Sequence, residues 1–189
     1  SRIELGTFAI EPKPWDLRKI AEGVWNELTP LVTQKKLNIK KEYEKKLGLL
    51  NVDPNLMQII FQNLFSNAAK YTPKGGMIEA SITRNKGEMM IRVSDSGYGI
   101  PYAARQKIFH KLFRADNVQK HDTEGTGLGL YIVKAVVEGS GGKIWFESPA
   151  RRSPEARPAA GKDENKGTTF YVTFPLSGMK KKEGTRGLS

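Results

Sequence analysis

The chain has 189 residues, no cysteine and a formal net charge of +11 at pH 7. This length suits one domain with a buried core, and the lack of cysteine excludes a fold held together by disulfides. No apolar run approaches the ~20 residues that span a bilayer, and residues 1–10 lack the layout of a signal peptide. We expect a soluble, cytoplasmic domain, and it stays open whether a longer parent protein is anchored in the inner membrane.

The positive charge is concentrated near the end of the chain. Residues 149–189 carry nine basic and four acidic side chains, which is almost half of the net excess. A nucleic-acid groove would combine such charge with aromatic side chains for base stacking, but residues 149–166 contain none. A solvated basic periphery is therefore favoured over a nucleic-acid site.

The first part of the chain predicts a strand, a helix and two further strands. Residues 3–10 alternate loosely and indicate a short edge strand, after which two prolines at positions 12 and 14 interrupt the chain. A helix is expected to begin near Asp16, because apolar side chains then recur at helical spacing. These side chains are Leu17, Ile20, Ala21, Val24, Leu28 and Leu31. Residues 37–43 and 49–52 have the composition of strands.

Residues 53–71 predict a second helix, with Asp53 as the capping side chain and Pro54 in the first turn. One side of this helix is apolar and should face the core, with Met57, Phe61, Leu64, Phe65 and Ala68. The opposite side should face water, with Gln58, Gln62, Ser66 and Ala69. The helix is therefore expected to lie half-buried on the sheet.

Three polar residues, Asn63, Asn67 and Lys70, interrupt the apolar stripe on an arc between those two sides. Half-buried amide and ammonium groups without partners cost about 1–3 kcal/mol each. A bound polyanion with its metal would supply partners, because an amide oxygen can coordinate Mg²⁺ and a lysine can contact phosphate. The simpler alternative, in which the three side chains face water, stays open.

The second half of the chain predicts the rest of a sheet and two helices. Strands over residues 77–83 and 89–94 flank a hairpin turn at residues 85–87 (NKG), which brings Asp95 to a strand end. The other expected elements are a short helix over residues 102–110, a longer helix over residues 128–139, and strands over residues 144–147 and 169–174. The longer helix should turn inward Leu128, Ile132, Ala135 and Val136. Helices against one side of a mixed, largely antiparallel sheet form an α+β fold, a two-layer α/β sandwich.

Two glycine-rich segments follow the hairpin, DSGYGI at residues 95–100 and GTGLGL at residues 125–130. Either alone would be an ordinary tight turn. Together, one led by a carboxylate and the other running into a helix, they suggest a nucleotide with its base at the first segment and its phosphates at the second. Other signatures fit worse, because no Walker-type loop occurs and the dinucleotide fingerprint would need glycine where Leu130 stands.

With these elements in view, the chain resembles the ATP-binding catalytic domain of sensor histidine kinases, within the GHKL superfamily. The matching motifs, in the family's order, are an N box at residues 63–71 (NLFSNAAKY), a first glycine box at 95–100, an F box at 108–114 (IFHKLFR), a second glycine box at 125–130 and a last glycine element at 167–170 (GTTF). The resemblance implies the Bergerat fold, ATP and Mg²⁺ as cofactors, and transfer of the γ-phosphoryl group to a histidine on a dimerisation domain absent from this chain.

The resemblance also implies roles for individual residues. Asp95 is expected to accept a hydrogen bond from the adenine amino group, which would favour ATP over GTP. Asn67 is expected to bind Mg²⁺. The expected catalytic residues are Asn63 beside the metal, Lys70 at the phosphates and Arg114 at the γ-phosphate. The remaining expected nucleotide contacts are Tyr71, Gly97, Gly99, Ile100, Lys111, Gly125, Gly127, Leu128, Gly129, Leu130 and Thr169. Of these, Tyr71, Ile100 and Leu130 would equally suit the core.

Residues 105–125 are expected to form a lid over the nucleotide, tethered by Phe109 and Phe113 and hinged near Gly125. The segment departs from the family pattern at two positions, with Leu112 where a second phenylalanine is common and His110 where an acid is common. Leucine fills the same pocket only approximately. The departure therefore bears on the anchoring of the lid more than on nucleotide binding.

The domain boundaries follow from the same resemblance. Residues 1–10 are interpreted as the tail of the dimerisation helix with a linker or edge strand, residues 11–177 as the catalytic domain with a flexible insertion at 149–166, and residues 178–189 as a basic tail. The two histidines, His110 and His121, suit solvated loops, so the chain is expected to bind ATP or ADP without phosphorylating itself. Its expected partners are the histidine-bearing dimerisation domain and a response regulator, with no nucleic acid and no membrane contact.

Two other functions stay open at this point. Related ATPases usually carry a glutamate where Asn63 stands, and that glutamate activates water. An amide cannot take a proton in this way, so a GHKL ATPase with rapid hydrolysis is disfavoured. The second alternative is a non-enzymatic nucleotide-binding regulatory or docking module. The presence of Asn67, Lys70, Asp95 and Arg114 argues against it.

Overall fold

The computed structural model describes residues 8–113, 126–149 and 167–184. Five strands form the main sheet in the spatial order β2-β4-β5-β7-β6. They are β2 (Asn38–Tyr43), β4 (Met77–Asn85), β5 (Glu88–Asp95), β6 (Lys143–Glu147) and β7 (Thr168–Pro175). Strand β2 runs parallel to β4, and the other neighbouring pairs are antiparallel. The expected mixed, largely antiparallel sheet is confirmed.

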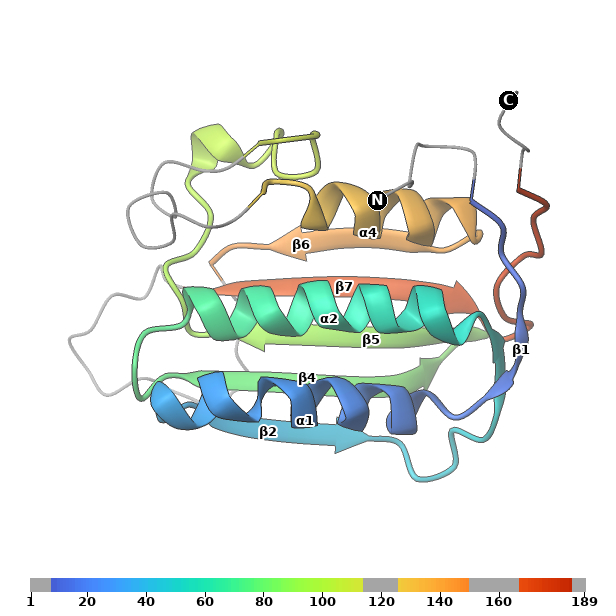
Figure 1. The fold of residues 1–189 in the computed structure, drawn as a ribbon, viewed down its shortest axis with the longest axis horizontal. Coiled ribbons are helices and arrows are strands. Elements are labelled where there is room, and N and C mark those ends of the chain that lie inside the picture. The colour runs from blue at the N-terminus through green and yellow to red at the C-terminus, as the bar shows by residue number, and fades with distance from the viewer. Residues whose placement is uncertain (1–7, 114–125, 150–166, 185–189) are drawn as a thin grey trace.

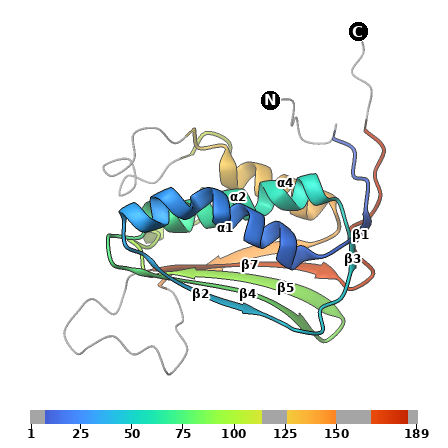
Figure 2. The ribbon, with the colours of Figure 1, turned by 60° about the horizontal axis from the view of Figure 1, so that its bottom comes forward.

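Helices cover one face of this sheet, as Figures 1 and 2 show. Within the described ranges they are α1 (Leu17–Gln34), α2 (Pro54–Tyr71) and α4 (Gly129–Gly139). Helix α2 lies between α1 and α4 and contacts both of them (Figure 1). The α+β two-layer sandwich is therefore confirmed, and the helix that carries the N box occupies the middle of the helical layer.

The start of α2 is fixed by the side chain of Asp53. Its Oδ1 accepts hydrogen bonds from the N–H groups of Asn55 at 3.0 Å and Leu56 at 3.2 Å, and its Oδ2 accepts one from the N–H of Glu11 at 3.0 Å. The helix thus begins where the capping pattern predicts. The expected water-facing side is wrong at Ala69, which is fully buried. Because α1 and α4 cover both flanks of α2, its buried arc is wider than one core-facing stripe.

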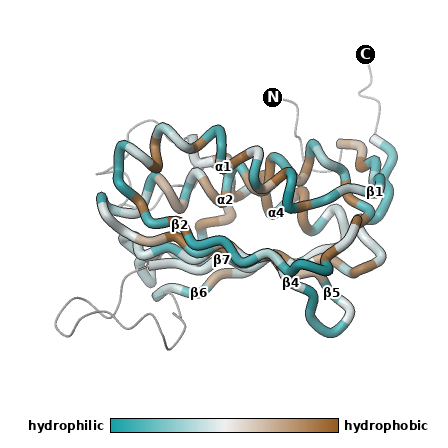
Figure 3. Tube along the Cα trace, turned by 90° about the horizontal axis from the view of Figure 1, so that it is seen from below, coloured by the Kyte–Doolittle hydropathy of each residue, from teal (hydrophilic) through white to brown (hydrophobic). Residues whose placement is uncertain are grey.

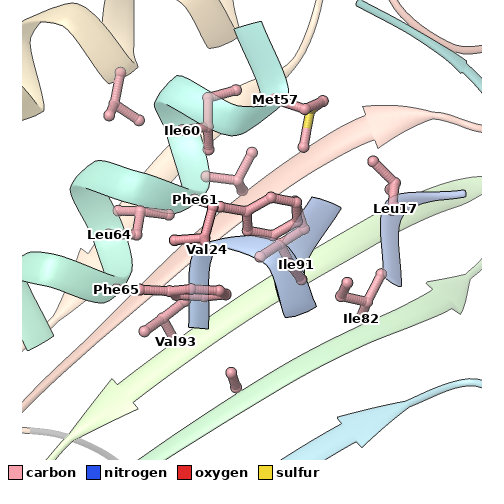
Figure 4. Packing of buried hydrophobic residues seen from close by; sticks show 14 of the residues in the cluster. Leu17, Val24, Met57, Ile60, Phe61, Leu64, Phe65, Ile82, Ile91 and Val93 are labelled. Atoms are coloured by element: carbon pink, nitrogen blue, oxygen red, sulfur yellow. The ribbon is translucent and has the colours of Figure 1, made fainter. Parts of the chain in front are cut away.

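The core lies between α1, α2 and the middle strands of the sheet (Figure 4). The rings of Phe61 and Phe65 lie 5.2 Å apart between their centroids. Trp25 of α1 stacks on Phe65 with a centroid distance of 4.3 Å and an interplanar angle of 13°. Large aromatic side chains dominate the energetics of such a core. These contacts join α1 to α2, and Figure 4 shows Ile91 and Val93 of β5 beside them.

A second, two-stranded sheet joins β1 (Lys13–Trp15) and β3 (Leu50–Val52) in antiparallel register. The expectation that prolines at 12 and 14 interrupt the chain is wrong at Pro14, which pairs with Asn51. Proline is tolerated there because a strand of a two-stranded sheet has a free edge. Of the strand expected over residues 3–10, residues 3–7 lie outside the described ranges, and Ile10 forms only an isolated bridge with Lys182.

Two other expected elements differ in detail from the structure. The segment 102–110 is a 3₁₀ turn, η1 (Tyr102–Ala104), followed by further turns rather than an α-helix. Its backbone bonds join residues three apart, such as His110 N–H to the Lys107 oxygen at 2.8 Å. In α4, Val133 and Val137 are buried beside the expected Ala135 and Val136, whereas Leu128 and Ile132 are only half-buried. The inner face of α4 is therefore rotated from the expected one.

One edge of the main sheet, strand β2, is polar. Figure 3 shows the edge strand β2 as largely hydrophilic, and its lysines Lys40 and Lys41 are exposed. Charged side chains on an edge strand oppose unwanted pairing with another chain.

In the predicted C-terminal tail, Met179 is buried and its N–H donates to the Asn51 oxygen at 2.8 Å. Among the described residues, no helix combines the length and apolar character needed to cross a membrane.

Candidate nucleotide-binding site

A cavity of about 210 Å³ opens between α2, the start of α4 and the ends of β5 and β7. Ten of the residues expected to contact nucleotide line it: Asn63, Asn67, Lys70, Tyr71, Asp95, Gly99, Ile100, Gly127, Gly129 and Leu130. The wall is completed by Ser66, Ala68, Ile108, Phe113, Thr126, Thr168 and Phe170. Two of the expected residues, Arg114 and Gly125, lie outside the described ranges.

The polar arc of α2 forms one side of this cavity. Asn63 uses its Nδ2 to donate to the Ile59 oxygen at 2.8 Å, so its donor is engaged within the helix. Asn63 and Asn67 are half-buried as expected. Lys70 is exposed, because it is the penultimate residue of α2, where the helix ends. In the part of the chain that the structure describes, no hydrogen bond or ion pair involves the side chains of Asn67 or Lys70. Both are therefore positioned to contact a ligand.

Helix α4 begins against Asn63. A Cβ atom on Gly129 would overlap the Asn63 Oδ1, so glycine at that position leaves room for the Asn63 amide beside the start of α4. Leu128 is the residue before the helix, and its N–H lies 3.4 Å from the Thr126 Oγ1. The first N–H groups of a helix have no acceptor within the helix. The cavity thus combines amide oxygens from α2 with the positive end of the α4 dipole.

The C-terminal turn of α2 is held by Lys35, a residue outside the sequence motifs. Its Nζ donates to the backbone oxygens of Ala69 at 2.8 Å and Lys70 at 2.6 Å. Burial lowers the pKa of the Lys35 ammonium. A cation at the last carbonyls of a helix satisfies groups that have no partner within the helix. Lys35 therefore fixes the turn from which Lys70 and Tyr71 reach the cavity, and no local sequence signal indicates this contact.

Asp95 forms the other end of the cavity. The hairpin of β4 and β5 turns at Lys86 and Gly87, both with positive φ, and returns the chain so that Asp95 ends β5. The Asp95 Oδ1 accepts hydrogen bonds from the N–H groups of Gly97 at 2.8 Å and Thr168 at 3.2 Å, and the residue is only 8% exposed. A Cβ on Gly97 would lie 2.5 Å from the Tyr71 oxygen, which requires glycine there. Gly97 therefore supports Asp95 rather than lining the cavity.

The last glycine element contributes Thr168 to the cavity instead of the expected Thr169. Asp95 is paired with Thr168 across β5 and β7, whereas Thr169 is paired with Ser94, and their hydroxyl oxygens lie 2.8 Å apart. Successive residues of a strand face opposite sides of the sheet. The apolar alternation Phe170, Val172 and Phe174 indicates which side of β7 faces the helices, so the sequence did contain a signal for Thr168.

The described part of the F box packs against the cavity wall. Phe109 meets the rings of Phe146 and Phe170 edge-on, with centroid distances of 6.0 and 6.5 Å. Phe113 is partly buried against the core and lines the cavity, so the two expected tethers both hold this segment. Lys111 and Leu112 are exposed. The remainder of the expected lid, residues 114–125, lies outside the described ranges.

The donor set of the cavity fits a nucleotide with a divalent cation. Amide oxygens are hard ligands that Mg²⁺ accepts, and Asn67 supplies one without adding negative charge next to phosphates. The start of α4 supplies positive charge beside Asn63, and Lys70 adds an ammonium group to the same cavity. Asp95 supplies an anionic hydrogen-bond acceptor at the other end. A ligand with an amino-bearing base and a phosphate tail satisfies both ends.

Comparison with known proteins assigns the fold and the motifs to one family. The chain belongs to the histidine kinase-, DNA gyrase B- and HSP90-like ATPases, whose family model matches residues 52–178. This match confirms the resemblance seen in the motifs.

Its curated relatives include sensor histidine kinases. The adaptive-response sensory kinase SasA of Synechococcus sp. (strain JA-3-3Ab) is 32% identical over 177 residues, which cover 93% of this chain and 42% of SasA. The sensor histidine kinase WalK of Bacillus subtilis (strain 168) is 36% identical over 128 residues, which cover 67% of this chain and 19% of WalK. The chain therefore spans less than half of the length of these relatives.

A solved structure has the same architecture. The catalytic domain of histidine kinase ThkA superimposes with a TM-score of 0.70 at 24% identity, covering 88% of this chain and 96% of that one. At this level of identity the similarity establishes the fold. The α+β sandwich described above is thus the fold of a histidine kinase catalytic domain.

The contact between Asn63 and Gly129 makes a testable prediction about stability. Gly129→Ala should destabilise the fold by about 1–3 kcal/mol, because the added methyl group displaces the Asn63 amide. Gly23→Ala, in α1, meets no atom within 4 Å and should stabilise by about 0.5–1 kcal/mol through helix propensity. Urea denaturation measures both. In the Asn63→Ala background the penalty of Gly129→Ala should disappear, and a penalty that persists there would contradict the contact.

Proposed function

We propose that this chain is the ATP-binding catalytic domain of a sensor histidine kinase. It binds ATP with Mg²⁺ and donates the γ-phosphoryl group to a histidine on a dimerisation domain. The observation that carries the proposal is one cavity lined by the Asp95 carboxylate and by the arc of Asn63, Asn67 and Lys70, with the N-terminus of α4 beside Asn63. The names of the curated relatives, and their greater length, support a kinase with a further domain.

Asp95 recognises the base in this proposal. The adenine amino group donates to the carboxylate, whereas guanine presents an oxygen at the equivalent ring position, so ATP is preferred over GTP. Tyr71, Ile100 and Leu130 line the same cavity and enclose the base with apolar surface. The two N–H groups that bind the Asp95 Oδ1 hold the carboxylate in place before the nucleotide arrives.

The phosphates lie at the start of α4. Backbone N–H groups of residues 127–129 donate to phosphate oxygens, and the Lys70 ammonium contributes a point charge. Asn67 would hold Mg²⁺ through its side-chain oxygen, and the Asn63 Oδ1 beside Gly129 would orient a water or another group near it. The bound cation would supply charge neutralisation at the phosphates. Arg114, assisted by Lys111, offsets the charge that develops at the γ-phosphate.

Asn63 distinguishes a kinase from a hydrolase in this cavity. Its Nδ2 is committed to the Ile59 oxygen, which leaves an amide oxygen toward the start of α4. An amide oxygen cannot accept a proton from water at neutral pH, so water is a poor nucleophile here. The incoming nucleophile is then the imidazole of the partner domain. A response regulator receives the phosphoryl group in the next step of such a system.

Base recognition is tested with Asp95→Asn. Asparagine keeps one oxygen for the N–H groups of Gly97 and Thr168 but replaces the second oxygen with a donor, which opposes the adenine amine. ATP affinity should fall about 10- to 100-fold in a calorimetric titration. The matched control is Glu79→Gln, which removes a carboxylate paired with Arg92 outside the cavity and should leave the affinity unchanged. Equal ATP affinity in Asp95→Asn and the parent chain would exclude this base pocket.

The expectation that this chain does not phosphorylate itself is tested by incubation with γ-labelled ATP and Mg²⁺. The chain alone should stay unlabelled, because neither histidine has the sequence context of the family's acceptor helix, and His110, the one that lies in the described ranges, is exposed and does not line the cavity. Addition of the histidine-bearing dimerisation domain from the parent kinase should yield acid-labile label on that domain. Stoichiometric label on the chain itself, or rapid release of inorganic phosphate without transfer, would contradict the proposal.

A further inference from the structure

A single buried hydroxyl connects three segments next to the proposed base pocket. Ser148 follows β6 and is 8% exposed. Its Oγ accepts a hydrogen bond from the N–H of Ile100 at 2.8 Å and donates to the oxygen of Gly167 at 3.0 Å. These partners lie 48 and 19 residues away along the chain. Ser148 thus joins the first glycine box to the last glycine element, although it does not line the cavity.

The hydrogen bond to Gly167 bears directly on Asp95. The Gly167 oxygen and the Thr168 N–H belong to the same peptide group, and a trans peptide directs them to opposite sides. The oxygen binds Ser148, and the N–H donates to the Asp95 Oδ1 at 3.2 Å. A continuous chain of donors therefore runs from the Ile100 N–H through the Ser148 hydroxyl and this peptide group to the carboxylate.

Every hydrogen bond in this chain points the same way. Each donor is directed toward the next acceptor and finally toward the carboxylate of Asp95, so each bond polarises the following one. The arrangement is also closely packed, since a Cβ on Gly99 would lie 3.2 Å from the Ser148 Oγ and 3.4 Å from the Gly167 oxygen. Loss of the hydroxyl would leave a buried N–H and a buried oxygen without their partner.

The residues at both ends of the chain belong to the cavity. Ile100, Thr168 and Asp95 all line it, and Gly99 lies on its wall beside Ser148. Movement of the Gly167–Thr168 peptide would therefore change the direction of the Asp95 carboxylate, to which its N–H donates. A change confined to Ser148 would reach the base end of the cavity without touching the phosphate end at α4.

We propose that Ser148 is a positioning residue for base recognition, which aligns Asp95 through the Gly167–Thr168 peptide group. The inference rests on the proposed function, because it takes Asp95 as the group that binds the purine amine. Ser148 contacts neither base nor phosphate. Its removal should lower the preference for a purine that carries the amino group, and leave the binding energy of the phosphates in place.

The experiment compares two nucleotides in Ser148→Ala and in the parent chain. ATP carries the amino group, and purine riboside triphosphate lacks it. In calorimetric titrations with Mg²⁺, Ser148→Ala should bind ATP about tenfold more weakly than the parent chain, with purine riboside triphosphate affected by less than about twofold. The preference for ATP should therefore shrink.

The matched control is Ser140→Ala. Ser140 is fully buried, its Oγ donates to the Val136 oxygen at 2.7 Å at the C-terminal end of α4, and it does not line the cavity. This variant removes a comparable buried hydroxyl and should leave the preference for ATP at the parental value. In Ser148→Ala, but not in Ser140→Ala, the Thr168 amide should exchange faster with deuterium, because the peptide group is no longer held.

The outcomes separate this inference from the proposed function. If the parent chain shows no preference for ATP that depends on Asp95, the base pocket itself is wrong. If that preference exists and Ser148→Ala keeps it in full, only the role of Ser148 is overturned. Should Ser148→Ala fail to fold, Ser148→Cys keeps the size with a weaker donor and should show an intermediate preference. A parental preference together with unchanged Thr168 exchange in that variant would equally overturn the inference.

Discussion

The close approach of α2 to the N-terminus of α4 determines where everything else in the site can lie. Asn63 occupies the space that a side chain at position 129 would fill. The amide groups of α2 therefore lie directly beside the N–H groups at the start of α4. Each of these features alone is common in proteins. Their juxtaposition yields a place where a cation and phosphates can be bound together.

This approach is maintained by packing at some distance from the cavity. Helix α2 is fixed to the sheet and to α1 through Phe61, Phe65 and Trp25, and its two ends are held by Asp53 and Lys35. The opposite end of the cavity depends on the sheet instead, because Asp95 and Thr168 are neighbours across β5 and β7. The site therefore spans both layers of the sandwich. The helical layer contributes the amide arc and the start of α4, and the sheet contributes Asp95 and Thr168.

Most of the secondary structure could be predicted because its causes are local. The cap at Asp53 and the apolar periodicity of α1 and α2 are visible in the sequence, and the hairpin turn is specified by three residues. The errors arise where tertiary contacts override these signals. Pro14 is accommodated by a free strand edge, and Ala69 is buried by a neighbouring helix.

The candidate site was predictable to the extent that its residues lie within motifs. The polar arc of α2 could be identified from helical spacing, and Asp95 from its place at a strand end before the first glycine box, with its role implied by the family resemblance. Thr168 could have been chosen over Thr169 from the alternation along β7. Lys35 and Ser148 could not, because their roles depend on backbone groups that are distant in sequence. Nothing in the sequence around a lysine or a serine indicates which distant backbone group its side chain will contact.

A calorimetric titration of the unaltered chain with ATP, once with Mg²⁺ and once with excess chelator, decides whether the cavity is a nucleotide site. We expect saturable binding of one ATP per chain that is clearly tighter with Mg²⁺, and loss of that difference in Asn67→Ala. No saturable ATP binding in the presence of Mg²⁺ would exclude a nucleotide site here, and a metal dependence that survives in Asn67→Ala would exclude Asn67 as the metal ligand.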